Sequence, residues 1–289
     1  MVAGSHPEAG HDTSADNRPV PVPHPWRWLS AALIAILAVS LAYSVIFNDR
    51  FQWPVFAEYV FSDPVLQGVG RTLVLTVMAM ACGMALGIPI AIMRISPNAL
   101  LAGFSWTYVN FFRAVPVLVQ LIFWYNLAAL YPVVSLSLPF LPELASIDAN
   151  VLITPLVAAL LGLGLNEAAN VAEIIRGGLL SVDRGQGEAA KALGMSRIRT
   201  TFRIVLPQAM RFIVPPIGNQ VIMMLKMTSL VSLISMNDLL YTTQIISART
   251  FSTIPLLLVA AAWYLFLTVL LSIGQHYLEA HFSRDTRRS

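Results

Sequence analysis

The stretch GQGEAAKALGMSRIRTTFRIVLP runs from Gly185 to Pro207 and lies between two long apolar runs. Its first part, Gln186 to Leu193, predicts a short helix, because alanine is the strongest helix former. Gly194 suits the left-handed position that follows the last turn of a helix. Ser196 can then cap a second helix, which we expect to stop before Pro207.

The first of these predicted helices has little side-chain bulk. It carries Ala189, Ala190 and Ala192 beside a single acid, Glu188. Small side chains let another surface come close to the helix backbone, and the carboxylate offers an acceptor for a donor on that surface. The segment therefore predicts a knob that docks into a socket on another protein.

The composition of the whole chain indicates a membrane protein. The 289 residues are 57% hydrophobic and 11% charged, with a mean hydropathy of +0.70, whereas soluble domains carry about 25% charged residues. This balance excludes a soluble enzyme, a secreted disulfide scaffold and a disordered protein. Cys82 is the only cysteine and the histidines lack ligand-spaced partners, so we expect no metal and no bound cofactor.

Six apolar runs are long enough to cross a bilayer, which takes about 20 residues per helix. The runs are Leu29–Phe47, Val69–Met93, Ala114–Tyr131, Leu152–Ile175, Phe212–Ile234 and Ile254–Ile273. The predicted fold is an all-α polytopic membrane protein with about six transmembrane helices. We expect residues 1–28 to be a disordered cytoplasmic tail, Leu100–Phe112 to be an interfacial elbow and residues 279–289 to be a second cytoplasmic tail.

The distribution of cations predicts the orientation of the chain. If the N-terminus is cytoplasmic, fourteen of the eighteen lysines and arginines face the cytoplasm, as the positive-inside rule requires. Both termini then lie inside, and the loops Asn48–Gly68 and Pro132–Val151 lie outside. The net charge of +3 reflects this topology, and the cations form no single stripe for nucleic acid.

Several polar side chains fall inside the predicted spans, where they are costly and usually face a cavity. The candidates for a substrate path are Gln120, Asn126, Asn166, Glu167, Asn170, Glu173, Asn219 and Lys226. Acids there could hold an α-amino group and the lysine could hold a carboxylate. Three of them also have a structural reading: Glu173 can pair with Arg176, Lys226 can snorkel, and Asn219 can bind backbone groups freed by nearby prolines.

The loop and its surroundings resemble the membrane subunits of ABC importers. Glu188-Ala-Ala, Gly194 and Leu206-Pro207 stand at the spacing of the EAA motif that defines these subunits. Further matches to the polar amino acid permease subfamily, which includes histidine, glutamine and arginine importers, are Phe112–Gln120, Ala172–Gly178, Pro207–Ala209 and Leu225–Leu230. The chain departs from the pattern at Ala114-Val115, at Asn170 and at Met227.

The resemblance implies a five-helix permease core over residues 68–278, to which the helix at 29–47 is extra. It implies a bacterial inner-membrane subunit that does no chemistry itself, coupled through the loop at 184–207 to a cytoplasmic ATPase dimer that binds ATP and Mg²⁺. The coupling residues would be Glu188, Ala189, Ala190, Gly194, Leu206 and Pro207. A second permease subunit, identical or different, and an external substrate-binding protein would complete the importer.

The sequence around the two lysines agrees with ATP binding on a separate subunit. Lys191 and Lys226 are the only two, and neither stands in the Gly-x-x-x-x-Gly-Lys-Ser/Thr sequence of a P-loop. Three alternatives to an amino acid importer stay open at this point. The same machine could carry an opine or an amino-acid derivative, an ion gradient could drive transport with Glu167 or Glu173 as proton carrier, or the chain could be a scaffold without transport.

Overall fold

The computed structural model describes residues 25–136 and 145–283, and these fall into two compact units that divide between Phe51 and Gln52. The first unit contains α1 (Pro25–Ile46) and a short 3-10 turn, η1 (Asp49–Phe51). α1 confirms a helix at the first predicted span and begins four residues before it. Most of the predicted N-terminal tail lies outside the described residues.

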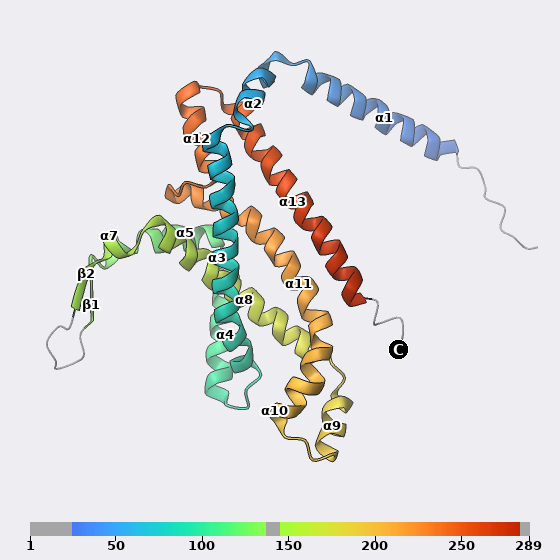
Figure 1. Ribbon diagram of the computed structural model, residues 1–289, viewed down its shortest axis with the longest axis vertical. Coiled ribbons are helices and arrows are strands. Elements are labelled where there is room, and N and C mark those ends of the chain that lie inside the picture. Colours follow the sequence, from blue (N-terminus) through green and yellow to red (C-terminus); the bar gives the residue numbers. More distant parts are fainter. Residues whose placement is uncertain (1–24, 137–144, 284–289) are drawn as a thin grey trace, which may run out of the picture. The chain divides into compact units, whose positions relative to one another are not determined.

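The second unit is almost entirely helical (Figure 1). Its α-helices are α2 (Trp53–Tyr59), α3 (Asp63–Arg94), α4 (Ala99–Ala114), α5 (Val117–Tyr125), α6 (Leu127–Leu130), α7 (Ala149–Leu152), α8 (Pro155–Leu180), α9 (Arg184–Ala192), α10 (Arg197–Thr200), α11 (Leu206–Met227), α12 (Leu239–Thr250) and α13 (Thr253–Ser283). A π turn, η2 (Thr201–Val205), and a 3-10 turn, η3 (Thr228–Ile234), flank α11.

The number of membrane-spanning helices agrees with the prediction. The described residues contain five helices that are long and apolar enough to cross a bilayer, or six if the bent pair of α4 and α5 makes one span. The predicted loop Pro132–Val151 contains two antiparallel strands that were not predicted, β1 (Val133–Leu136) and β2 (Ala145–Asp148). α12 was not predicted.

The core of this unit is the close packing of α3 on α8. A Cβ atom on Gly87 would stand 2.8 Å from the backbone oxygen of Ala168, and one on Gly83 would stand 2.6 Å from the side chain of Glu167. On the other side of α8, a Cβ on Gly162 would press on Leu121 of α5 at the same 2.6 Å. These glycines let three helices approach each other closely.

The third predicted span, Ala114–Tyr131, is wrong as a single helix. α4 and α5 meet at an angle of 98°, and α5 has nine residues, which extend about 14 Å and cannot cross a bilayer of about 30 Å. Pro116 causes the bend, because it lacks an N–H and keeps Val115 in an extended conformation. The residues of the predicted elbow, Leu100–Phe112, belong to the helix α4, and their position at the membrane interface stays a prediction.

The expected stop before Pro207 is also wrong. Helical backbone continues from α10 through η2 into α11, with Pro207 in the first turn of α11. The π turn supplies the physical reason. Its hydrogen bonds close wider rings directly before Pro207, whose ring would otherwise press on the carbonyl of Arg203.

The prolines of the fifth span do not break it. α11 passes through Pro215 and Pro216 and ends at Met227, and η3 completes the predicted span to Ile234. Gln275 of α13 donates a hydrogen bond from Nε2 to the carbonyl of Pro215 at 2.8 Å. Gly218 makes room for this side chain, since a Cβ there would collide with the Gln275 amide.

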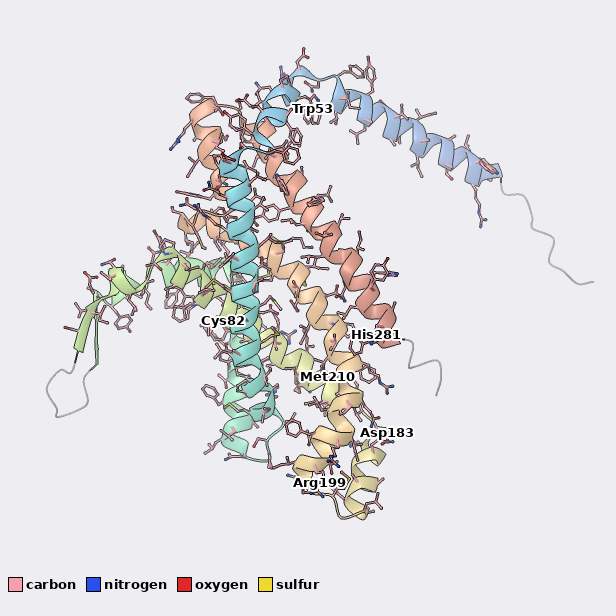
Figure 2. All side chains as sticks on the ribbon, in the orientation of Figure 1. Trp53, Cys82, Asp183, Arg199, Met210 and His281 are labelled. Atoms are coloured by element: carbon pink, nitrogen blue, oxygen red, sulfur yellow. The ribbon has the colours of Figure 1, made fainter. Side chains whose placement is uncertain are left out.

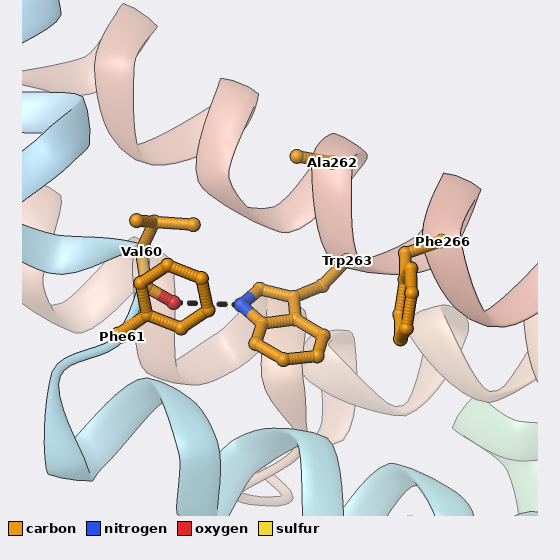
Figure 3. A pocket seen from close by; sticks show the side chains of 5 residues that line it. All are labelled: Val60, Phe61, Ala262, Trp263 and Phe266. Carbon is orange, nitrogen blue, oxygen red and sulfur yellow. Dashed lines mark hydrogen bonds between the residues drawn. The ribbon is translucent and has the colours of Figure 1, made fainter.

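The short helix α2 is fixed to α13 by an aromatic contact (Figure 3). Trp263 donates from Nε1 to the carbonyl of Val60 at 2.7 Å. The ring of Phe61 stands edge-on to this tryptophan at 6.0 Å, and Phe266 contacts its other side at 5.7 Å. With Ala262 these residues line an apolar pocket of about 360 Å³.

Candidate functional site

The helix α9 has well-defined hydrogen-bonded ends. At its start, Asp183 Oδ1 accepts a hydrogen bond from the backbone N–H of Gly185 at 2.6 Å. At its end, the backbone N–H of Gly194 donates to Lys191 and that of Met195 donates to Ala190, at 2.9 and 3.0 Å. These two bonds form a Schellman motif, and Gly194 adopts the left-handed φ of 74° that the motif requires. The predicted end of the helix is therefore confirmed.

The coupling residues predicted from the sequence divide into an exposed set and a packed set. Glu188, Ala189 and Gly194 are exposed, whereas Ala190 is 1% exposed. At the start of α11, Pro207 is exposed and Leu206 is half-buried. Figure 2 shows Asp183 and Arg199 in the region of α9 and α10.

The surface around α9 combines charge with apolar side chains. A hollow of about 330 Å³ is lined by Glu188 together with Arg184, Lys191 and Arg197. Leu193, directly after α9, and Ile198 of α10 are 81% and 74% exposed. A short exposed helix with a charged side and an apolar tip is suited to docking on another protein.

Two of the predicted path residues bind the backbone at the α4–α5 bend. Gln120 donates from Nε2 to the carbonyls of Phe112 and Val115 at 3.0 and 2.9 Å. Asn166 of α8 donates from Nδ2 to the same Phe112 carbonyl at 2.6 Å. The bend frees these carbonyls from their helical partners, so the two buried amides replace the lost bonds.

Near these amides, buried polar side chains have oxygen atoms that accept no hydrogen bond from the described residues. Asn170 donates from Nδ2 to Asn166 Oδ1 at 3.3 Å, so these two amides share one helix face as predicted. Glu167 is 1% exposed and packs on Gly83. Within the part of the chain that the structure describes, the Oε1 atoms of Glu167 and Gln120 are buried without a hydrogen-bond partner. Buried acceptors of this kind are suited to a ligand or an ordered water.

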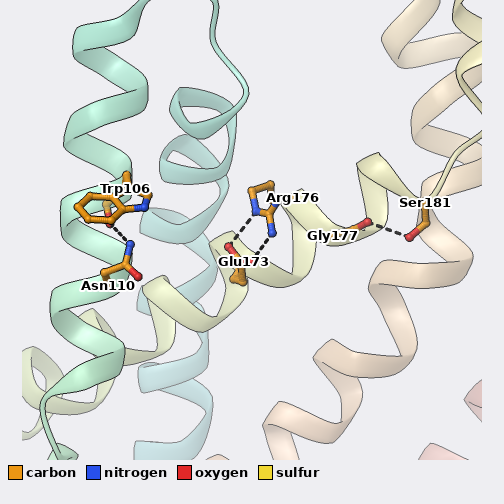
Figure 4. A network of polar contacts seen from close by, with 6 residues as sticks. All are labelled: Trp106, Asn110, Glu173, Arg176, Gly177 and Ser181. Atoms are coloured by element: carbon orange, nitrogen blue, oxygen red, sulfur yellow. Dashed lines mark hydrogen bonds and ion pairs between the residues drawn. The ribbon is translucent and has the colours of Figure 1, made fainter.

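Glu173 forms the ion pair that was one of its two predicted roles (Figure 4). Both of its carboxylate oxygens accept from Arg176, the Nε bond measuring 2.9 Å. Arg94 and Arg113 also lie close enough to interact electrostatically with this carboxylate. Glu173 therefore belongs to a cluster of charges at the same end of α3 and α8.

The remaining candidates do not join the α8 face. Asn219 and Lys226 of α11 are exposed, and no hydrogen bond in the described residues links them to α8. Asn126 donates to the carbonyl of Ile122 at 2.8 Å and lines a cavity of about 630 Å³. Asn150 and Thr154 line the same cavity. Neither was predicted, because Asn150 lies within the predicted loop Pro132–Val151 and Thr154 is the N-cap of α8.

Residues 25–136 and 145–283 hold no group of three or more histidine, cysteine, aspartate or glutamate side chains suited to a metal ion. The absence of a metal in the functional protein stays a prediction.

These helices define a multi-pass membrane protein with an exposed helical loop between two of its spans. The chain belongs to the family described as binding-protein-dependent transport system inner membrane components, which matches residues 83–284. It is thus a membrane component of an import system that works with a binding protein.

Named relatives of this chain are permease proteins. The arginine transport system permease protein ArgU of Corynebacterium glutamicum is 42% identical over 282 residues, covering 96% of this chain and 87% of that protein. The nopaline transport system permease protein NocM of Agrobacterium fabrum is 36% identical, covering 75% and 88%. The L-cystine transport system permease protein TcyB of Bacillus subtilis is 35% identical, covering 76% and 88%.

Solved structures agree with this assignment. A crystal structure of an amino acid ABC transporter with histidines contains a chain that is 31% identical, with a TM-score of 0.66, covering 75% of this chain and 94% of that one. An inward-facing structure of the MetNI methionine ABC transporter has a TM-score of 0.57 at 17% identity and supports the fold alone.

Proposed function

We propose that this chain carries polar amino acids across the inner membrane in an ATP-driven importer, and that a cytoplasmic ATPase docks on α9. The observation that carries the proposal is the geometry of the coupling loop. Glu188, Ala189 and Leu193 are exposed around a helix whose two ends are fixed by their own hydrogen bonds. Membership of the family and relatives named for arginine and cystine support the amino acid class.

A movement of α9 can be transmitted directly to the membrane-spanning helix α11. α9 contacts α10 and η2, and the backbone from Arg197 to Ile234 is continuous helix. Gln208 of α11 also reaches Gln186 of α9, with 3.5 Å between Nε2 and Oε1. When the ATPases close, the docked helices of two membrane subunits move together, and α11 follows. This couples ATP binding to the change from an inward-facing to an outward-facing state.

The substrate contacts in this proposal come from the part of the α8 face that the backbone does not use. Glu167 supplies a carboxyl group for the α-amino group, and Asn170 supplies an amide. Gln120 and Asn166 hold the bend that shapes this region, and the cavity beside Asn126 lies along the route of entry. Lys226 and Asn219 would bind the substrate carboxylate only in a state that turns them toward α8.

The complete importer requires further subunits. We place both termini and α9 in the cytoplasm, following the distribution of lysine and arginine. A second membrane subunit completes the path, and an external binding protein delivers the substrate. ATP and Mg²⁺ bind to the ATPase dimer.

The test is transport by the purified complex in lipid vesicles with its binding protein. We expect Glu188→Ala and Gly194→Val to keep ATP hydrolysis while uptake falls at least tenfold, because the docked helix no longer transmits the movement. Gly103→Ala is the control, since this glycine lies on α4 outside the coupling loop and a Cβ there would meet open space. Normal uptake in both coupling variants at equal expression would contradict the proposal.

An opine is the second candidate substrate, because permeases for nopaline and octopine are 36% identical to this chain. The same vesicles distinguish the candidates. Arginine, glutamine, cystine and octopine are offered in turn, and the one whose loaded binding protein stimulates ATP hydrolysis identifies the class. Uptake driven by an ion gradient without any ATPase would instead support a secondary carrier.

A further inference from the structure

Arg71 of α3 borders a cavity whose lining includes none of the residues assigned to the substrate path. The cavity has a volume of about 520 Å³ and lies between α3, the first turn of α8 and the segment that joins η3 to α12. Gln67, Gly70 and Arg71 make up its polar end. The rest of its lining is apolar and includes Val74, Met78 and Met236.

The length of α3 places Arg71 at a defined height in the membrane. Arg71 and Arg94 are 23 residues apart on one helix (94 − 71), which separates them by about 35 Å along its axis. The segment between them carries no charge, and the hydrocarbon core of a bilayer is about 30 Å thick. Each arginine therefore lies near one boundary between hydrocarbon and headgroups.

The two arginines differ in their surroundings. Arg94 lies within electrostatic reach of Glu173. Arg71 is exposed, and in the described residues its side chain makes no hydrogen bond or ion pair. No acidic side chain lines its cavity. A cation at this boundary can extend its side chain into the headgroup layer, where the phosphates of anionic lipids are available partners.

We propose that this cavity binds an anionic phospholipid. The phosphate binds the guanidinium of Arg71, which can donate two parallel hydrogen bonds to it, and the amide of Gln67 adds a third donor. One acyl chain follows Val74 and Met78, which lie one turn apart on the same helix face. Methionine side chains adapt to the irregular surface of such a chain.

The chemistry of the lining favours this ligand over the transported substrate. A zwitterionic amino acid would leave its ammonium group without an acidic partner here. An anion with a long apolar tail satisfies both ends of the cavity. Because the cavity joins α3, Leu156 of α8 and Met236, the bound lipid stabilises the contact of these three segments.

Native mass spectrometry of the full chain, purified with the subunits that accompany it, tests this site. The probes are phosphatidylglycerol and phosphatidylcholine. We expect the wild type to retain phosphatidylglycerol in preference, and Arg71→Gln to weaken its binding about fivefold, as for one cation near a membrane surface. Arg249→Gln is the control, because Arg249 is an exposed cation outside the spans that does not line the cavity.

A second pair of variants fills the cavity without removing charge. A Cβ on Gly70 meets open space, and the same holds for Gly103 of α4, so both glycines accept a larger side chain locally. Gly70→Phe should displace the phospholipid, whereas Gly103→Phe should not.

Three results would overturn the proposal. The first is unchanged retention of phosphatidylglycerol in both Arg71→Gln and Gly70→Phe. The second is an equal loss in Arg249→Gln, which would indicate general attraction of anionic lipid. The third is separation of two membrane subunits by Gly70→Phe with no loss of lipid, which would make the cavity a subunit interface.

Discussion

The coupling loop and the α4–α5 bend both depend on hydrogen bonds at helix ends, but they find their partners at different distances along the chain. In the loop, Asp183 binds Gly185, and Gly194 binds Lys191. At the bend, the carbonyl of Phe112 is bound by Asn166, 54 residues away. The loop can therefore form by itself, whereas the bend exists only when α8 has packed beside it.

This difference separates function from stability. A substitution in the loop changes a segment that can unfold locally, so it has a small effect on the free energy of unfolding of the rest of the molecule. A substitution at the bend removes a hydrogen-bond donor from a buried carbonyl and lowers the free energy of unfolding of the whole unit. Polar side chains in a membrane span can be occupied by hydrogen bonds to the backbone. Only the side-chain groups without such a bond are available to a ligand.

The largest effect is expected at Asp238, which combines a local and a distant bond. Its Oδ1 caps α12 by accepting from the N–H of Tyr241 at 2.8 Å, and its Oδ2 accepts from the hydroxyl of Tyr264 in α13 at 3.2 Å. Burial raises the pKa of this carboxyl group to about 6 from its usual 3.8, although these hydrogen bonds oppose the shift. The folded protein therefore holds a proton between pH 4 and 6 that the unfolded chain has released.

Because the pKa of Asp238 is raised in the folded protein, this group makes the protein more stable at low pH than at neutral pH. The stabilisation is complete below about pH 4, is lost as the pH rises through 6, and amounts to about 3 kcal/mol. Thermal unfolding in detergent from pH 4 to 7 measures it. Asp238→Asn should flatten the curve over this range, and Tyr264→Phe should move the transition to higher pH. Identical pH curves for wild type and Asp238→Asn would refute this account.

The second effect is expected at the bend. Asn166→Leu removes one of two side-chain donors to the Phe112 carbonyl and should lower the free energy of unfolding by about 2 kcal/mol. Asn170→Leu is the matched control, because it leaves both bonds to Phe112 in place. If Asn166→Leu abolishes transport at unchanged stability, the amide binds substrate and the structural role assigned here is wrong.

The same contrast explains what could be predicted from the sequence. The end of α9 at Gly194 depends on nearby residues and a glycine signal, and it was predicted correctly. The bend at Pro116 was misread, because an apolar run does not reveal that its helix is only nine residues long. Gln275 of α13, which binds Pro215, carried no local signal at all. Long-range partners of this kind follow only from the packed structure.

A smaller effect is expected at Gly194. Gly194→Ala forces a Cβ into a left-handed conformation at a cost of about 1 kcal/mol. Because a Cβ there would meet open space, the strain is confined to the backbone. Hydrogen exchange should accelerate about fivefold at the amides of Gly194 and Met195, while the melting temperature changes little. A fall in melting temperature as large as that of Asn166→Leu would show that the loop is not independent of the core.

The smallest effect is expected at the cap of α10. Ser196 Oγ accepts from the N–H of Arg199 at 3.4 Å, a long hydrogen bond, whereas Asp183 caps α9 at 2.6 Å. Ser196→Ala should cost about 0.5 kcal/mol, at the lower end for the loss of a cap, and Asp183→Ala about 1 kcal/mol or more. Hydrogen exchange at the amides of Arg199 and Gly185 compares the two caps directly. Because the helical backbone continues from α10 into α11, a weak cap suffices there, and an equal or larger effect at Ser196 would mean that α10 folds as a separate helix.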